Sequence, residues 1–399
     1  MVKDSVFNRK TYINTLETLV NIKSEYFHEE EILEYIYNRL VEKNIKVEIH
    51  EYHDEEITGF KGKNLIGRMG NPNAGPKILL NAHVDTVNLV SGWTYSPHKM
   101  TIEENKAYGL GTCDMKSGVA AILLALEELS TYESEMKGEI IFSFVSDEEG
   151  PFGLGTNYLI HDQLINDADV AIVTEPSSAF SQKSFPNICL GARGGTSYRV
   201  DFYGKAAHAA NPHFGISAIK DAAKVIETID QIELKDDGIL GKGTNCVIDF
   251  KGGGDACSVA DHAYFKVFRH MVIGESNDTV FEEIDSLIRG LDIKSDYKIT
   301  FRKGPTEDSD GFMPYVVDPN DDYVEKFVEV VANVSEKDPN FSYFSSIGDF
   351  NYLGSRLNIP VIVFGADGGN YHSADEWVDI PSAVTLTEAV YEYLVEMLL

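Results

Sequence analysis

The apolar residues of this chain recur at helical spacing near its start and form short, continuous runs further on. Residues 27–43 place apolar side chains on one face and glutamate and lysine on the other, which predicts an amphipathic helix. Strand-like runs follow at residues 46–52, 64–68 and 77–81. The run 78–80 is apolar throughout, as is typical of a strand covered on both faces.

An apolar, alanine-rich segment at residues 116–129 predicts a buried helix. Further apolar runs predict buried strands at residues 138–145, 169–174 and 360–365. Strands that alternate with helices indicate a mostly parallel sheet flanked by helices on both sides. The expected fold class is therefore α/β.

The pattern changes between residues 188 and 302. The expected elements there are a strand at 196–203, a helix at 216–229, strands at 245–250 and 263–272, a helix at 280–291 and a strand at 297–302. This β-α-β-β-α-β order predicts a ferredoxin-like sandwich, in which two helices cover one face of an antiparallel sheet. Because the parallel pattern resumes near Tyr323, we expect an inserted domain at residues 185–305, between the two parts of a main domain at 1–184 and 306–399.

The charge of the chain limits its possible partners. Its 399 residues include 64 Asp and Glu but only 34 Lys and Arg, for a net charge of −30. Nucleic acid is not expected as a partner, because its phosphates need Lys and Arg. An anionic membrane surface is disfavoured for the same reason. The excess of acidic residues is typical of a surface that keeps a protein soluble, and adaptation to high salt is an alternative explanation.

No targeting or spanning segment is expected. Residues 1–10 are polar and of mixed charge, whereas a secretory leader needs an apolar stretch of about 7–15 residues. No apolar run approaches the roughly 20 residues that span a bilayer. The cysteines lack CxxC spacing and lie at Cys113, Cys189, Cys246 and Cys257. These features predict a reduced, cytoplasmic protein.

Residues able to bind a metal follow the predicted buried strands. They are His83 and Asp85, Glu148 and Glu149, Glu175, and His372, with Asp114 just before the helix near residue 116. Ligands of open parallel sheets bind at the carboxyl ends of the strands, so these side chains are expected at one edge. Any one of them alone could be a helix cap or a surface charge. Together, imidazoles and carboxylates predict a zinc site that also tolerates cobalt or manganese.

Several segments resemble a known enzyme family in order and spacing, over nearly the whole chain. The segments are Asn81–Val87, Gly109–Gly118, Ser146–Gly150, Thr174–Pro176, Gly204–Ala209 and Tyr371–Glu376. They resemble the co-catalytic zinc aminoacylases and carboxypeptidase G-type peptidases, which include acetylornithine deacetylase, succinyl-diaminopimelate desuccinylase and several dipeptidases. The resemblance implies that the main domain is catalytic and that the insert serves as a lid or for dimerisation.

The resemblance also implies a ligand set for two Zn²⁺ ions. Asp114 would bridge the ions, His83 and Glu175 would complete the shell of one, and Glu149 and His372 that of the other. Ions in such two-metal sites lie about 3.5–4 Å apart. The family holds the peptide bond after the bridging aspartate in cis, so Asp114–Met115 is expected to be cis.

Two acidic residues beside these ligands are expected to assist them. Asp85 would accept a hydrogen bond from His83 and so fix its tautomer. Glu148 would act as general base, taking a proton from the attacking water and returning it to the leaving nitrogen. Alternatively, Glu148 is a further metal ligand or an inert neighbour.

The insert is expected to complete the site. In the family, a histidine of this domain donates to the oxyanion, often from the partner subunit; here it would be His208, with Asn245 as a second donor. This implies a homodimer paired through the inserted domains. As a residue taken alone, His208 could equally be an ordinary residue at a strand end.

The sequence departs from the family pattern at the position expected to contact the substrate carboxylate. Relatives use an arginine late in the insert, but in Phe268–Glu275 its position is taken by His270, and Arg269 is one residue away. Adjacent strand residues face opposite sides, so either a bulge brings in Arg269 or His270 acts instead. Arg193 is a further candidate for anion contact. Each of these could also be a surface ion pair.

The leading hypothesis is a hydrolase of a small N-acylated amino acid, of the acetylornithine deacetylase or succinyl-diaminopimelate desuccinylase type. A dipeptidase or other exopeptidase acting on short peptides would use the same chemistry with different pocket walls. A hydrolase of carbamoyl amino acids and a non-catalytic protein that keeps the fold are further alternatives. A non-catalytic protein would be expected to lack one of the metal ligands or the general base, and all of these residues are present.

Overall fold

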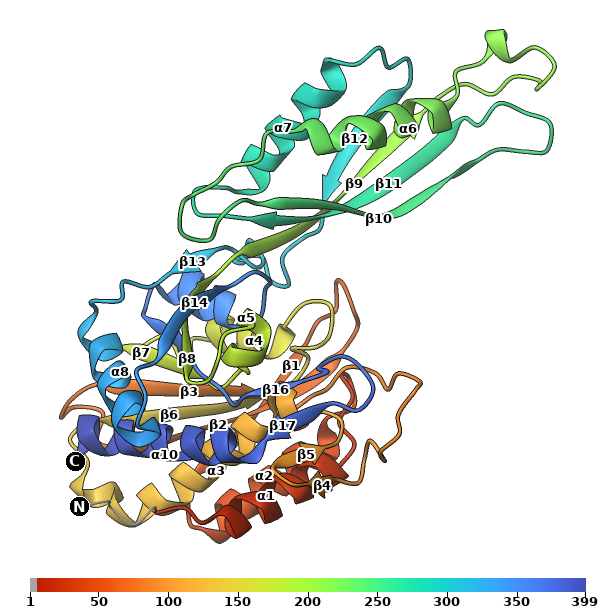
Figure 1. Ribbon diagram of the computed structural model, residues 1–399. Coiled ribbons are helices and arrows are strands. Elements are labelled where there is room, and N and C mark those ends of the chain that lie inside the picture. Colours follow the sequence, from red (N-terminus) through yellow and green to blue (C-terminus); the bar gives the residue numbers. More distant parts are fainter. Residues whose placement is uncertain (1–5) are drawn as a thin grey trace.

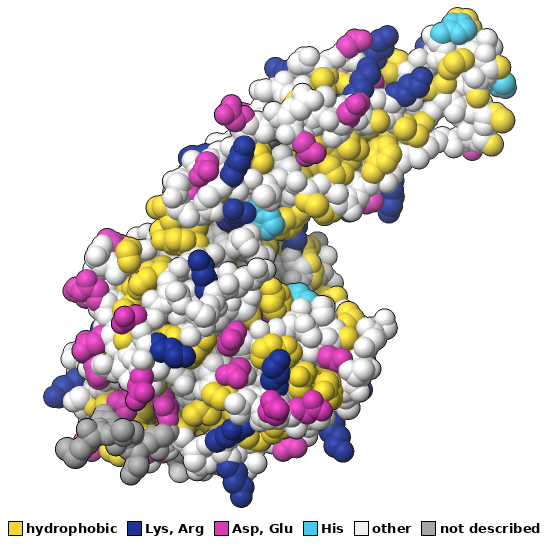
Figure 2. All heavy atoms as spheres, viewed as in Figure 1, with side chains coloured by type: hydrophobic (Ala, Val, Ile, Leu, Met, Phe, Trp, Pro, Cys, Tyr) yellow, Lys and Arg dark blue, Asp and Glu magenta, His cyan; other side chains and the backbone are white. Residues whose placement is uncertain are grey.

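The computed structural model describes residues 6–399, in two parts that Figure 1 separates clearly. Residues 1–5, the first half of the polar N-terminal stretch 1–10, lie outside the described range. The large part contains both ends of the described chain, and the small part extends from it. Figure 2 shows acidic and basic side chains interspersed over the visible face, without a single charged patch.

The large part is built on a nine-stranded mixed sheet. Its strands, in spatial order, are β1 (Val47–His53), β2 (Lys61–Gly70), β6 (Glu139–Val145), β3 (Lys77–His83), β7 (Val170–Val173), β15 (Val361–Val363), β8 (Asn187–Ala192) and β13 (Tyr315–Val316), with β14 (Asn340–Phe344) paired to β8. The central strands β6, β3, β7 and β15 are parallel to one another. The predicted α/β fold with a mostly parallel sheet is confirmed.

Helices cover both sides of this sheet, as Figure 1 shows. They are α1 (Arg9–Asn21), α2 (Glu30–Glu42), α3 (Ser117–Leu129), α4 (Leu154–His161), α5 (Ser177–Ser181), α8 (Asp322–Ser335), α9 (Phe350–Tyr352) and α10 (Ile380–Leu398). Nearly every side chain of α3 is buried, because it packs against α1 and α10 as well as the sheet. Its uniformly apolar sequence follows from this position.

The small part is an antiparallel sheet with its own hydrophobic core. Its spatial order is β10 (Thr244–Gly253), β11 (His262–Met271), β9 (Gly194–Tyr203) and β12 (Asp296–Phe301), and its helices are α6 (Ala218–Thr228) and α7 (Asn277–Arg289). Both helices lie on one face of the sheet (Figure 1). The order of elements along the chain is the one that the sequence predicts.

The chain passes into the small part later than expected. Strand β8 lies within the range 185–305 predicted for the insert, yet it pairs with β14 and β15 of the large sheet. The crossing therefore falls at Arg193, between β8 and β9.

A third, small sheet was not predicted. It joins β16 (Gly368–Gly369), β17 (Trp377–Asp379), β5 (Lys106–Tyr108) and β4 (Thr101–Glu103). It brings the loop that carries His372 beside the segment that leads to Asp114. Short 3₁₀ turns lie at Ser130–Glu135, Pro212–Phe214 and Ile229–Gln231, and π-helical turns at Thr112–Lys116 and Leu353–Leu357. Over residues 6–399, none of the helices combines the length and apolar character required to cross a bilayer.

Candidate metal centre

His83 ends β3 and lies at the centre of an acidic cluster. Its side chain is 1% exposed. Its Nε2 atom lies 3.2 Å from Asp114 Oδ1 and 3.2 Å from Glu175 Oε1. Its Nδ1 atom lies 3.1 Å from the backbone oxygen of Asp85. An imidazole held through one nitrogen, with the other facing carboxylates, has the arrangement of a metal ligand.

Asp85 is fully buried and holds the loop that follows β6. Its Oδ1 accepts the backbone N–H of Glu148 at 3.2 Å, and its Oδ2 accepts that of Glu149 at 2.8 Å. The carboxylate also lies 3.4 Å from His83 Nδ1. Asp85 therefore orients two strand ends at once. The hydrogen bonds to the Glu148 and Glu149 backbone were not anticipated from the sequence.

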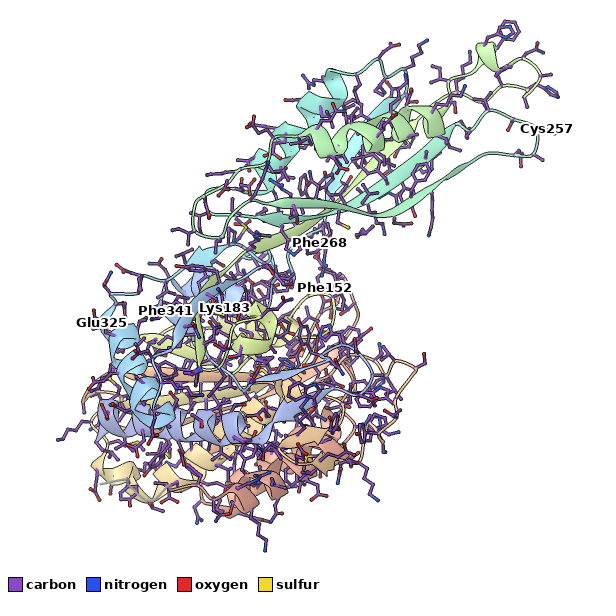
Figure 3. All side chains as sticks on the ribbon, viewed as in Figure 1. Phe152, Lys183, Cys257, Phe268, Glu325 and Phe341 are labelled. Carbon is purple, nitrogen blue, oxygen red and sulfur yellow. The ribbon has the colours of Figure 1, made fainter. Side chains whose placement is uncertain are left out.

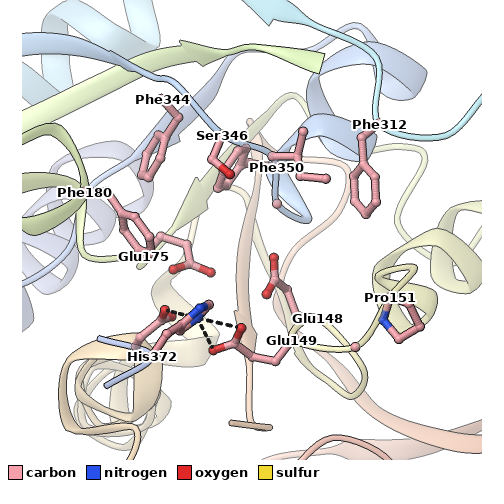
Figure 4. Close-up of a pocket in the computed structure, with 14 residues that line it drawn as sticks. Glu148, Glu149, Pro151, Glu175, Phe180, Phe312, Phe344, Ser346, Phe350 and His372 are labelled. Carbon is pink, nitrogen blue, oxygen red and sulfur yellow. Dashed lines mark hydrogen bonds and ion pairs between the residues drawn. The ribbon is translucent and has the colours of Figure 1, made fainter. Parts of the chain in front are cut away.

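Asp114 connects the two histidines. Its Oδ1 faces His83, and its Oδ2 lies 3.3 Å from His372 Nε2. The peptide bond between Asp114 and Met115 is cis, so this expectation is confirmed. His372 Nε2 also lies 2.9 Å from Glu149 Oε2. The His372 side chain is 48% exposed, so the cluster is open on this side (Figure 4).

The donor atoms lie close enough to share a cation. Two triplets have donor atoms all within 4.8 Å of one another: His83, Asp114 and Glu149, and His83, Glu148 and Glu175. Imidazole nitrogens combined with carboxylate oxygens suit zinc and related divalent ions. The structure thus brings together the five predicted ligands and the predicted base. The division into two ions stays a prediction.

Without a cation, the cluster is electrostatically unfavourable. Burial, together with the charge of Asp114, raises the pKa of Glu149 and of Glu175 to about 7 each. Hydrogen bonds to Asp114 and Glu149 raise the pKa of His372 to about 11. Burial raises the pKa of Glu148 well above its usual range, although His83 opposes the shift. A bound divalent cation would relieve the repulsion among these acids.

We expect zinc to stabilise the protein more at pH 8 than at pH 5.5. Raised carboxyl pKa values reduce the stability of the metal-free fold as pH rises from about 4.5 to about 7. The stabilising charge of His372 is fully present below about pH 6.5 and is lost as pH rises toward 11, so it acts in the same direction. Ligands must also lose protons to bind metal. Melting temperatures with and without zinc at both pH values measure this; an equal shift would contradict it.

Glu376 positions the loop that carries Asp114. This carboxylate is 1% exposed. It accepts backbone N–H groups from Gly111 at 2.7 Å, Cys113 at 2.8 Å and Asp114 at 3.0 Å. Burial raises its pKa to about 7. Sequence reasoning included Glu376 in a matching segment but gave it no role, because its backbone partners are more than 250 residues away.

Replacement of Glu376 by glutamine should weaken zinc binding about 10- to 100-fold, as is typical for groups that hold metal ligands in place. The amide nitrogen cannot accept a hydrogen bond, so one of the backbone donors loses its partner. Competition with a zinc-binding dye measures the change. The control is Glu282→Gln, at an exposed glutamate of α7. Unchanged zinc affinity in a folded Glu376 variant would refute the positioning role.

The structure separates the two candidate residues on β11. Strand β11 pairs with β9 without a register shift, so no bulge reorients its side chains. Arg269 is fully buried on the core side and forms an ion pair with Glu275. His270 lies on the opposite face, with its Nδ1 3.0 Å from Thr244 Oγ1. The open face of this sheet therefore carries His270 and not Arg269.

The other two candidates lie near the junction of the parts. The Arg193 side chain donates from Nε to the backbone oxygen of Leu240 at 3.0 Å. Asn245 pairs in register with Arg269, and its buried Oδ1 accepts no hydrogen bond within the described part of the chain. Neither residue lines the cavity beside the metal cluster.

His208 lies far from the cluster of its own chain. It is exposed, and its backbone forms an isolated antiparallel β-bridge with Ser258. The next residue, Ala209, donates its N–H to the Cys257 backbone oxygen at 2.7 Å. Figure 3 labels Cys257 at the tip of the small part, remote from the large sheet. Within one chain, the structure does not bring His208 to the candidate metal centre.

A cavity of about 180 Å³ adjoins the cluster. Figure 4 shows Glu148, Glu149, Glu175 and His372 on one side of it and a group of aromatic side chains on the other. The aromatic side chains are Phe180, Phe312, Phe344 and Phe350. Sequence reasoning missed them, because isolated phenylalanines carry no pattern that distinguishes a pocket wall from a core.

Comparison with known proteins places this arrangement among hydrolases of amide bonds. Residues 79–396 match the description "Peptidase family M20/M25/M40". The chain is 27% identical to a succinyl-diaminopimelate desuccinylase of Rickettsia felis, over 97% of this chain and 100% of that protein. It is also 27% identical to the desuccinylase of a Sulfurovum species, over 80% of this chain and 83% of that one.

Solved structures support the fold. A tripeptidase of Staphylococcus aureus superposes with a TM-score of 0.79 at 23% identity, covering 98% of each chain. Aminopeptidase PepT of Bacillus cereus superposes with a TM-score of 0.78 at 21% identity, covering 98% of this chain and 99% of that one. The fold and the site together define a metal-dependent amide hydrolase. The chain belongs to peptidase family M20/M25/M40, and the family resemblance expected from the sequence is confirmed.

Proposed function

We propose that the protein hydrolyses the amide bond of a small N-acylated amino acid or short peptide, with two divalent cations held by His83, Asp114, Glu149, Glu175 and His372. The observation that carries this proposal is the contact of both histidines with Asp114, at 3.2 and 3.3 Å. Zinc suits the donor set, and cobalt or manganese are alternatives. Bound divalent cations would supply Lewis acidity to polarise the amide carbonyl and acidify water.

Glu148 provides the proton transfers. Its Oε2 lies 3.9 Å from His83 Nε2, and its Oε1 accepts the backbone N–H of Asp349 at 3.2 Å. It thus reaches the centre of the cluster while one of its oxygens is anchored. As base it would take a proton from the attacking water, and as acid it would deliver that proton to the leaving nitrogen. Asp85 keeps the Glu148 backbone in place.

A panel of acetyl-, succinyl- and aminoacyl-amino acids, assayed after chelation and after return of zinc, tests the reaction. We expect hydrolysis of at least one member only in the presence of metal. Activity that survives thorough chelation would overturn the proposal, as would a lack of activity in protein with two equivalents of zinc bound.

Because the four cysteines form no disulfides, we also propose a cytoplasmic location.

We further propose that His208 acts in a homodimer, on the site of the partner subunit. Its place at the tip of the small part leaves it no access to its own cluster. Edge strand β10 exposes Val247, Ile248 and Phe250, which a second copy could cover. The His208 side chain would then donate to the oxyanion, a contribution of about 10²–10³ in kcat.

Mixing Glu148→Ala and His208→Ala chains should restore activity that neither has alone. Each mixed dimer contains one site with both side chains intact, so an equal mixture should recover about a quarter of the wild-type activity. Dissociation and reassociation before the assay ensure exchange, and affinity tags of two kinds isolate the mixed dimers. Isolated mixed dimers that remain inactive would show that His208 does not act across the interface.

A further inference from the structure

We infer that the cavity beside the metal cluster selects an apolar, preferably aromatic, group next to the scissile amide and discriminates against a second carboxylate. The inference rests on the proposed amide hydrolysis and narrows its substrate class. It is based on the described side chains that line the cavity, among which lysine and arginine do not occur.

The apolar wall combines segments that are distant in the sequence. Phe180 extends from α5, Phe312 precedes β13, Phe344 ends β14 and Phe350 begins α9, with Ile347 between the last two. In Figure 4 these aromatic rings face the carboxylates across the cavity. A wall assembled by tertiary packing from several segments has a definite shape, which a flexible loop would lack.

The wall is held in place by aromatic packing. The rings of Phe344 and Phe350 lie 4.8 Å apart, and those of Phe180 and Phe344 lie 5.4 Å apart. Phe180 also packs against Tyr371, with centroids 4.4 Å apart. Phe344 and Phe350 are 4% and 2% exposed, whereas Phe180 and Phe312 are more exposed. Phe180 and Phe312 are therefore the rings with most surface free for a ligand.

The polar side of the cavity consists of the metal cluster and one serine hydroxyl. Its ionisable lining residues are Asp114, Glu148, Glu149, Glu175 and His372, and Ser346 adds a hydroxyl. Lysine and arginine do not occur in this lining, which falls wholly within the described residues. Arg193 and Arg269, the candidate anion contacts, donate instead to Leu240 and Glu275.

A succinyl group or an acidic side chain would meet unfavourable surroundings here. Its additional carboxylate would be desolvated between phenylalanines, and the described lining offers it no lysine or arginine as a partner. An apolar group loses no such hydration and gains contacts with the rings. Since even one methylene in a hydrophobic pocket changes kcat/KM about tenfold or more, a phenyl group should be preferred over a carboxylate by at least about 100-fold.

The test compares substrates that differ on one side of the bond. N-phenylacetylglycine against N-succinylglycine probes the acyl side, and N-acetylphenylalanine against N-acetylaspartate probes the amine side. We expect at least about 100-fold higher kcat/KM for the aromatic member on one side. That ratio should fall at least about tenfold in Phe180→Ala and Phe312→Ala. Equal or higher rates for the acidic members on both sides would overturn the inference.

A control and a second readout separate this inference from the proposed reaction. Phe341→Ala, at a ring 47% exposed on the same strand as Phe344, should leave both ratios unchanged. If no amide is cleaved, the proposed function fails, and binding to the zinc-loaded protein decides the inference. Calorimetry should then show phenylacetate binding more tightly than succinate, with the difference reduced in Phe180→Ala. The reverse order would refute an apolar subsite.

Discussion

Replacement of Glu148 by glutamine is expected to lower kcat by about 10²–10⁴ while the bound metal remains. The amide keeps the volume of the side chain but cannot take a proton from water. It can still occupy the place of Oε1, where the carboxylate now accepts the N–H of Asp349. The loss should therefore reflect proton transfer and not a collapsed site. Steady-state kinetics together with metal analysis by mass spectrometry measure both quantities.

The control for this experiment is Glu325→Gln, at an exposed glutamate in the first turn of α8 on the large part. It changes the same functional group away from the cluster, so kcat and metal content should both stay at wild-type values. A Glu148→Gln protein with near-normal turnover would refute the general base. A variant that loses metal in proportion to activity would identify Glu148 as a ligand, the alternative left open by the sequence.

Replacement of Asp114 by alanine should abolish metal binding and activity together. Asp114 is the carboxylate that contacts both histidines, so its removal opens both halves of the cluster. His372→Ala removes the ion pairs of the histidine with Asp114 and Glu149 and should leave one ion bound. Activity in the Asp114 variant is expected to fall by at least about 10³, since cation and general base act as a unit.

Metal content per chain distinguishes these cases directly. We expect about zero equivalents in Asp114→Ala and about one in His372→Ala, against two in the wild type, as a two-metal site requires. Circular dichroism and a cooperative melt show that the variants are folded. Retention of two equivalents by folded Asp114→Ala would end the proposal of a bridging carboxylate.

The buried strands and their order could be read from the sequence because their pattern is local. The run 78–80 is continuously apolar and 140–145 is apolar apart from Ser143, and both prove to lie in buried central strands. Short elements were missed for the opposite reason. Strands β16 and β17 have two and three residues. Strand β17 pairs with β5, which is more than 250 residues away, and β16 pairs with β17. No local pattern encodes such a contact.

The same distinction applies to the site. Ligands at strand ends were predictable, because parallel strands bring their carboxyl ends to one edge. The backbone contacts of Asp85 and Glu376, and the phenylalanine wall, arise only when loops fold over that edge. The orientation of Arg269 was undecided in the sequence, because it depends on register and on the buried partner Glu275.

All of the residues that would hold cations come from the large part of the molecule, and the chain leaves for the small part only after β8. A change in tilt between the two parts would therefore leave the distances among these donors intact. Occupancy by metal and the approach of a substrate or a neighbouring subunit can vary independently. Substitutions confined to the small part can thus alter turnover in an enzyme that stays fully loaded.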